Sequence, residues 1–262
     1  MPCAIEGDGE GEGARFRLKK HATVISYGEH ADGILATARR SQESPPSDQV
    51  LAVLGRGDYR LEQTTGWDTL GMRGTCSNGY WLLAEAAREQ ILPVPYADIS
   101  AQTMLPTSHL TWSSLWAGIA TAAVSRARAY IRGEARKKPG TTPPGALRLA
   151  EAVSMLQLMK SNVVAAARQY MAAVDAVEPL TSLGFAIAMN NVKTGTSQMA
   201  VQVIDHALLV CGIAGYRNDN KFSIGRQLRD AHSAALMVSN DRILGNTANL
   251  LLVQKDDTGL FT

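Results

Sequence analysis

The sequence predicts an α+β protein in which an antiparallel β-domain precedes a C-terminal four-helix bundle. From Ala14 to about Asp98, short strand-like segments alternate with turn formers, whereas after Pro106 the segments become long, alanine-rich and nearly free of helix breakers. A run of strands followed by a run of helices is typical of α+β proteins, because α/β proteins alternate the two kinds of element.

The β-domain is expected over residues 14–105, after a glycine-rich flexible leader at residues 1–13. Its strands are expected at residues 15–18, 23–27, 33–38, 50–54, 60–64 and 80–84. Turn formers such as Gly28 and the SNG sequence at 77–79 separate them. The leader run GDGEGEG lacks the lysine and the Ser/Thr of a phosphate-binding loop, and its acids would repel phosphate, so we interpret it as a leader only.

The helical bundle is expected over residues 106–262, with four helices. They are expected at residues 110–133, 146–177, 181–212 and 223–253. In the second, apolar residues recur every three or four positions, which places them on one face that must pack against the other helices. The sequence GEARKKPGTTPPG at 133–145 is the expected loop between the first two helices.

Composition narrows the classes of function. The formal charge is +2, from 26 basic and 24 acidic residues, which provides no strong field for nucleic acid or an anionic membrane. Three cysteines without CxxC spacing argue against a disulfide framework or a zinc site, and the five histidines form no metal-binding pair. The N-terminus has no secretory signal pattern and no apolar run is long enough to span a bilayer, so we expect a cytoplasmic protein.

Two segments of the β-domain have a recognisable pattern. Residues 19–39 read KKHATVISYGEHADGILATAR, and residues 66–82 read GWDTLGMRGTCSNGYWL. Both resemble segments of the acyl-CoA dehydrogenase family, in which the first lies against the flavin and the second contains an LGMR string. The resemblance implies a fold like the family's middle and C-terminal domains, an FAD cofactor, and flavin contacts from Ile25, Ser26 and Arg73. A backbone amide and a small hydroxyl at that place can stabilise charge that develops on the flavin ring.

A third segment, LLVCGIAGYRNDNKFSIGRQLRDAH at 208–232, resembles the family's glycine turn and the R-x-x-R-D string that follows it. In the family this turn approaches the adenosine-diphosphate half of FAD on a neighbouring subunit, which implies cofactor contacts from Gly212, Gly215 and Tyr216. Leu209 replaces the family's glutamine and Ile213 one of its glycines. Near residues 134–139, EARKKP replaces the family's Arg-Phe-Gly, and its basic side chains can be interpreted equally as a pyrophosphate contact or as a solvated surface.

The family's proton acceptor is missing from both of its familiar places. The usual glutamate, eight residues after the aspartate of the RD pair, is Val238 here, and Trp112 lies where a minority of the family carries its glutamate. Abstraction of the α-proton requires a base beside the substrate. Asp241, nearly one helical turn beyond Val238, is the candidate catalytic residue as a displaced base, with a surface or structural role as the alternative.

The resemblance also implies a partial β-domain, because the family's N-terminal helical domain has no counterpart. We therefore expect an FAD-dependent acyl-CoA dehydrogenase-like flavoprotein that catalyses α,β-dehydrogenation of an acyl thioester, carried by CoA or an acyl carrier. It is expected to act in a homo-oligomer or in a hetero-oligomer with a related dehydrogenase subunit, which supplies the missing parts. The alternative is a non-catalytic dehydrogenase-like subunit that stabilises an active paralogue or binds an acyl carrier.

Overall fold

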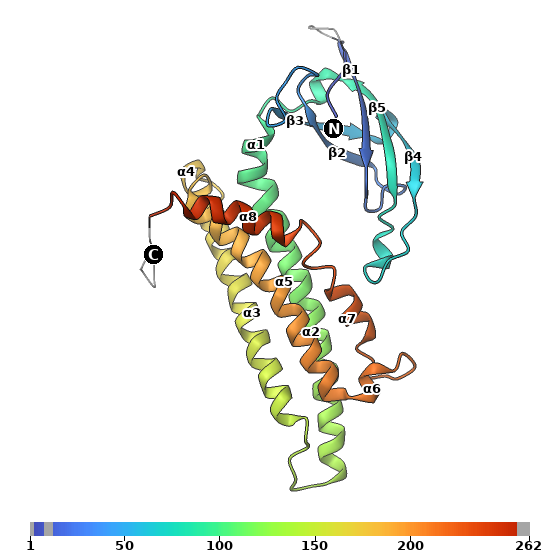
Figure 1. Cartoon of the computed structure of the whole chain (residues 1–262), viewed down its shortest axis with the longest axis vertical. Helices are drawn as coiled ribbons and strands as arrows, with labels where there is room; N and C mark the ends of the chain where they lie inside the picture. Colours follow the sequence, from blue (N-terminus) through green and yellow to red (C-terminus); the bar gives the residue numbers. More distant parts are fainter. Residues whose placement is uncertain (1–2, 8–12, 256–262) are drawn as a thin grey trace. The chain divides into compact units, whose positions relative to one another are not determined.

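The chain forms two compact units, Met1–Ser100 and Ala101–Thr262, in a computed structural model that describes residues 3–7 and 13–255 (Figure 1). The first unit contains strands and the second is helical, so the expected α+β order is confirmed. The units meet at residues 100 and 101, slightly before the expected boundary at residues 105 and 106.

The first unit consists of two antiparallel sheets. One has the strand order β1-β5-β4, from Arg15–Ala22, Gly79–Ala87 and Tyr59–Thr65, and the other pairs β2 (Gly33–Arg39) with β3 (Gln49–Gly55). The short helix α1, Tyr96–Ile99, follows. Residues buried on β1 alternate with exposed ones, as expected for a strand with one face in the core. Phe16, Leu18 and Leu82 from the first sheet form one core cluster with Val50 and Leu54 from the second.

The N-terminal residues of the expected leader belong to this fold. The Ile5 N–H donates to the Arg39 carbonyl at 2.9 Å, the Glu6 N–H donates to the Arg17 carbonyl at 2.9 Å, and the Ile5 side chain lies in the core cluster. Residues 8–12, which contain most of the GDGEGEG run, lie outside the described residues. Residues 3–7 are thus an ordered strip rather than a leader, because Ile5 gains burial between the two sheets.

The expected strand at residues 23–27 is wrong, since the chain leaves the sheet after Ala22. The backbone N–H groups of Ile25 and Tyr27 donate to the carbonyls of Asn78 and Thr75, which belong to a loop and not to a neighbouring strand. Tyr27 has a φ of 55°, a left-handed conformation that ends an extended segment. A short alternating pattern cannot distinguish a strand from such a docked turn.

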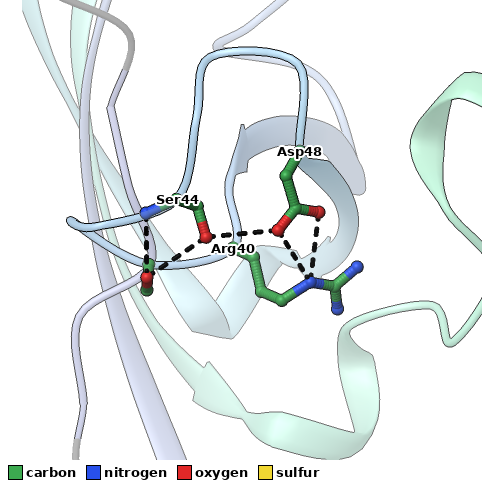
Figure 2. A network of polar contacts seen from close by, with 4 residues as sticks. Arg40, Ser44 and Asp48 are labelled. Atoms are coloured by element: carbon green, nitrogen blue, oxygen red, sulfur yellow. Dashed lines mark hydrogen bonds and ion pairs between the residues drawn. The ribbon is translucent and has the colours of Figure 1, made fainter.

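A polar network closes the loop between β2 and β3 (Figure 2). The Arg40 Nε donates to both carboxylate oxygens of Asp48 at 3.2 Å, and the Ser44 hydroxyl donates to the same carboxylate at 3.2 Å. The ion pair is at the surface and contributes little to stability by itself. Its effect is to fix the loop that sets the register of the β2–β3 pair.

The second unit is built on three long helices that lie side by side, α2 (Leu105–Lys137), α3 (Ala146–Ala173) and α5 (Leu183–Cys211) (Figure 1). Alanines at 117, 120, 123 and 127 form a buried strip on α2, and their small side chains allow the helices to approach closely. α2 extends beyond the expected 110–133 at both ends. Pro106 stands in its first turn, directly after the π-helical turn Ser100–Met104, where the hydrogen-bond pattern of the helix is already irregular and a missing N–H is tolerated.

The expected fourth helix at residues 223–253 is broken in two. α7 spans Gly225–Ala231 and α8 spans Asn240–Leu251, with a turn at residues 232–239 between them. Val238 and Ser239 in this turn have φ values of 58° and 41°. A helix cannot pass through left-handed residues, and the apolar periodicity of the sequence continues across the break without marking it. The short helices α4 (Val177–Leu180) and α6 (Ile213–Tyr216) complete the unit. Within the described ranges, no helix has the length and apolar character needed to cross a membrane.

Candidate functional site

Two loops that are far apart in the sequence meet in the first unit. The Ser26 and Ser77 hydroxyl oxygens lie 2.8 Å apart, and the Thr75 hydroxyl oxygen lies 2.7 Å from that of Ser77. Thr75 also donates its single hydroxyl proton to the Met72 carbonyl at 2.9 Å, so Ser77 donates to Thr75 and Ser26 donates to Ser77. Ser77 is buried while Ser26 is exposed, so the chain of hydroxyls runs from the interior to the surface.

The loop at residues 66–78 is held by its own side chains. The Trp67 indole N–H donates to the Met72 carbonyl at 3.0 Å, and the Arg73 Nε donates to the Thr69 carbonyl at 2.7 Å. Met72 has a φ of 54°, and such a conformation persists in a non-glycine residue only when its surroundings fix it. The Arg73 side chain is 67% exposed, so one face of its guanidinium remains open to solvent while it supports the loop.

A buried tyrosine that the sequence did not indicate lies below this loop. The Tyr80 hydroxyl donates to the Glu29 carboxylate at 3.2 Å and accepts from the Asn78 amide at 3.2 Å. Burial raises the pKa of Tyr80 above its usual value, so the hydroxyl keeps its proton at neutral pH. The apolar alternation of β5 predicts that Tyr80 faces the core, but the alternation carries no signal for its partner Glu29.

The glycine turn of the second unit follows α5 and contains two glycines with different roles. Gly212 has a φ of 56°, and a Cβ built there would meet no atom within 4 Å. At Gly215 a Cβ would lie 2.6 Å from the Cβ of Cys211. Gly212 thus provides open backbone, whereas Gly215 is required by internal packing.

Three large side chains around this turn face solvent. Tyr216 is 71% exposed, and Leu209 and Ile213 are 60% and 75% exposed. The basic residues expected in the loop after the first helix instead occupy its last turn, because α2 continues to Lys137. Lys137 is paired with Glu134 at 2.7 Å, and this hydrogen bond raises the pKa of the lysine, while Arg136 and Lys138 remain exposed.

The region around Val238 contains a buried polar cluster instead of a carboxylate. The Lys193 ammonium donates to the Asn240 side-chain oxygen at 2.6 Å and to the Ala234 carbonyl at 3.1 Å. The Asn240 amide donates to the Ser197 hydroxyl at 2.9 Å. Asp241, in the first turn of α8, is exposed, so this candidate base lies beside the cluster without entering it.

Both familiar base positions are connected to this cluster. Trp112 stacks on Trp116 with ring centroids 5.7 Å apart, and the Lys193 Nζ lies 5.4 Å from the Trp116 ring. Lys193 in turn holds both ends of the turn that contains Val238. Sequence reasoning missed Lys193, although its position one helical turn from the apolar Met189 on the inner face of α5 was an available signal.

Comparison with known proteins decides the family. Residues 100–245, more than half of the chain, match the family model described as "Acyl-CoA dehydrogenase, C-terminal domain". The chain belongs to the acyl-CoA dehydrogenase family. The resemblance found in the motifs is therefore confirmed. No curated protein matches the sequence significantly.

Solved structures of this family share the fold. An acyl-CoA dehydrogenase from Geobacillus kaustophilus is similar with a TM-score of 0.76 and 18% identity, over 96% of this chain and 64% of that one. A butyryl-CoA dehydrogenase from Megasphaera elsdenii gives 0.71 and 19%, over 95% and 62%. A dibenzothiophene monooxygenase from Paenibacillus sp. A11-2 gives 0.78 and 18%, over 99% and 70%. The chain spans less than two thirds of the length of both dehydrogenases.

Within the family framework, the structure brings together some of the expected site residues. Ile25 and Ser26 dock on the loop that contains Arg73, and Gly212, Gly215 and Tyr216 form one turn. Asp241 follows the turn that contains Val238.

Proposed function

We propose that this acyl-CoA dehydrogenase-family protein binds FAD and takes part in α,β-dehydrogenation of an acyl thioester, in an oligomer with a complementary subunit. The observation that carries the proposal is the docking of the 23–30 loop on the 66–78 loop through Ser26, Ser77 and Thr75. The two loops each resemble a segment of the family's flavin site, and they are adjacent in space. A pattern produced by chance would have no reason to bring them together.

The exposed Ser26 oxygen keeps a lone pair that fits the N–H donor on the polar edge of a flavin ring, because its own proton is donated to Ser77. In the proposal, the Ser26 hydroxyl oxygen contacts that edge, Ser77 and Thr75 hold Ser26, and the Ile25 N–H fixes the loop beside it by donating to the Asn78 carbonyl. Gly212 offers open backbone to the adenosine-diphosphate half, with Tyr216 exposed beside it. When bound, FAD supplies the acceptor for the hydride that leaves the β-carbon of the thioester.

The α-proton needs a separate acceptor. Val238 and Trp112 have no titratable group, and we propose Asp241 as the displaced base that this chain itself can offer. Its exposure at the start of α8 leaves the carboxylate free to contact a substrate that a complementary subunit helps to enclose. The Asp241→Asn substitution should abolish anaerobic bleaching of the flavin by acyl-CoA. Unchanged bleaching would assign the proton to a base on the complementary subunit.

The flavin site is tested by titrating FAD into the purified chain and following flavin fluorescence. Ser77→Ala removes the hydroxyl at the centre of the chain and should weaken FAD binding about fivefold, since one hydrogen bond contributes on the order of 1 kcal/mol. Ser47→Ala, in the exposed loop between β2 and β3, is the matched control and should leave the affinity unchanged. Equal affinities for both variants would refute the proposed site.

A second candidate function is oxygenation of an aromatic substrate by reduced flavin and O₂. The absence of a carboxylate at positions 238 and 112 favours it, because transfer of one oxygen atom to an aromatic ring, with the other leaving as water, requires no α-proton acceptor. The monooxygenase of similar fold has been solved with FMN and with indole. Chemically reduced flavin, O₂ and indole should then give an oxygenated product, and acyl-CoA should not bleach the flavin. A chain that does neither and binds no flavin is the non-catalytic subunit.

A further inference from the structure

Lys193 is a fully buried cation without an anionic partner. Its side chain is 0% exposed, and none of the ion pairs found in residues 3–7 and 13–255 includes it. The ammonium has the Asn240 side-chain oxygen at 2.6 Å, the Ala234 carbonyl at 3.1 Å and the Trp116 ring as its neighbours. Buried lysines are rare unless they are paired, so this arrangement calls for a functional explanation.

Both acceptors belong to the boundaries of one turn. Ala234 lies near its start and Asn240 begins α8, so a single ammonium links the two ends of the segment at residues 232–239. The Asn240 N–H also donates to the Ala235 carbonyl at 2.9 Å, and its side-chain amide donates to Ser197. Between these anchors lie Val238 and Ser239 in left-handed conformations. A β-branched residue adopts such a conformation only when its surroundings determine it.

Burial lowers the pKa of Lys193 from 10.5 to about 8. A titratable neighbour among the described residues is His109 of α2, whose pKa is lowered by burial and also by the charge on Lys193. His109 is therefore neutral above pH 7, whereas Lys193 loses its proton between pH 7 and 9.5. Because a closed turn excludes water from the amine and an open turn hydrates it, protonation favours opening and deprotonation favours closure.

We infer that Lys193 is a positioning residue, which sets the conformation of the turn at residues 232–239 and so fixes what position 238 presents to a bound substrate. The turn is held most firmly around a neutral amine, and a proton on Lys193 biases it towards opening. The link to a substrate rests on the proposed function, whereas the coupling between Lys193 and the turn does not. A merely structural lysine would stabilise the unit without making this turn respond to pH.

Hydrogen exchange of the full chain tests the coupling. After correction for the intrinsic exchange rate, protection of the amides at residues 232–240 should rise between pH 7 and 9.5. The rise should be at most about thirtyfold, for a Lys193 pKa of about 8 when the turn is closed and 10.5 when it is open. Lys193→Met, which keeps the length of the side chain without its charge, should remove the pH response. Lys160→Met, on the exposed face of α3, is the control and should retain it.

A second variant preserves the test if Lys193→Met does not fold. Asn240→Asp places a carboxylate at the same acceptor position, which keeps the ammonium charged and should move the rise in protection above pH 9.5. The inference would be overturned if protection of these amides did not change with pH in the natural chain, or if its pH dependence were the same in the variants. A rise confined to amides of α2 and α5 that exchange by global unfolding would overturn it as well. Failure to bind flavin would refute the proposed function and leave this exchange test intact.

Discussion

Replacing Gly215 by alanine should destabilise the helical unit because of packing, whatever ligand the glycine turn binds. The added Cβ would lie 2.6 Å from the Cβ of Cys211 and 3.4 Å from side-chain atoms of Ile224 and Leu208. The first contact cannot be relieved by a rotation, because both Cβ atoms are fixed to the backbone. α5 and α6 would have to separate slightly at the turn that Gly212 forms.

The magnitude follows from two opposing effects. Overpacking of a close-packed interior costs about 1–3 kcal/mol. Replacing glycine by alanine in a helix contributes about 0.5–1 kcal/mol of stabilisation, less in a helix as short as α6. The net prediction is a loss of about 1–2 kcal/mol in the free energy of unfolding of this unit.

Gly118→Ala is the matched control. Gly118 lies on the exposed face of α2, and a Cβ there meets nothing within 4 Å. It should stabilise the unit by about 0.5–1 kcal/mol, so the two variants differ in sign. The helical circular dichroism signal followed during urea unfolding measures the difference. If Gly215→Ala is as stable as Gly118→Ala, the close approach to Cys211 is wrong and the glycine serves another purpose.

Three further predictions concern stability. Ser182→Ala removes the side chain that caps α5 by accepting from the Phe185 N–H at 3.2 Å, and should cost about 1 kcal/mol in urea unfolding; no loss would show that the cap is not formed in solution. The hydrogen bond from Gln90 lowers the pKa of Asp58 in the folded state. The ionised carboxylate therefore stabilises the fold above its unfolded-state pKa, and this stabilisation is lost as pH falls through the lower pKa of the folded state. Acid unfolding followed by tryptophan fluorescence should therefore be less steep in Asp58→Asn. Burial lowers the pKa of Lys193 to about 8, so the free energy of unfolding of the helical unit, measured in urea, should rise by about 2 kcal/mol from pH 7 to 9.5. Lys193→Met should abolish this rise.

Much of the fold could be predicted from local patterns. The strands around Phe16, Val50 and Leu82 and the three long helices have the periodicity of half-buried elements. The patterns failed where tertiary contacts decide the backbone. Residues 23–27 have strand-like composition, but the N–H groups of Ile25 and Tyr27 donate to a loop about fifty residues further along the chain. Residues 232–239 continue an apolar helical pattern that a buried lysine and a left-handed Val238 interrupt.

The candidate site could be predicted only in part. The motif that includes Ser26 predicted a flavin contact by resemblance, but the hydrogen bonds that join Ser26 to Ser77 depend on a register that the sequence does not contain. Gly215 was assigned to the cofactor, whereas its surroundings show a packing requirement as well. Lys193 was missed because a lysine in a helix is usually solvent-facing, and only the three-dimensional packing of α2, α5 and α8 buries it.

The most direct test of flavin binding is the visible absorption spectrum of the purified chain after incubation with FAD and removal of the free cofactor. We expect a protein-bound flavin spectrum that is retained in the Ser47→Ala control and reduced in Ser77→Ala. A colourless protein, obtained both alone and together with a complementary dehydrogenase subunit, would contradict it.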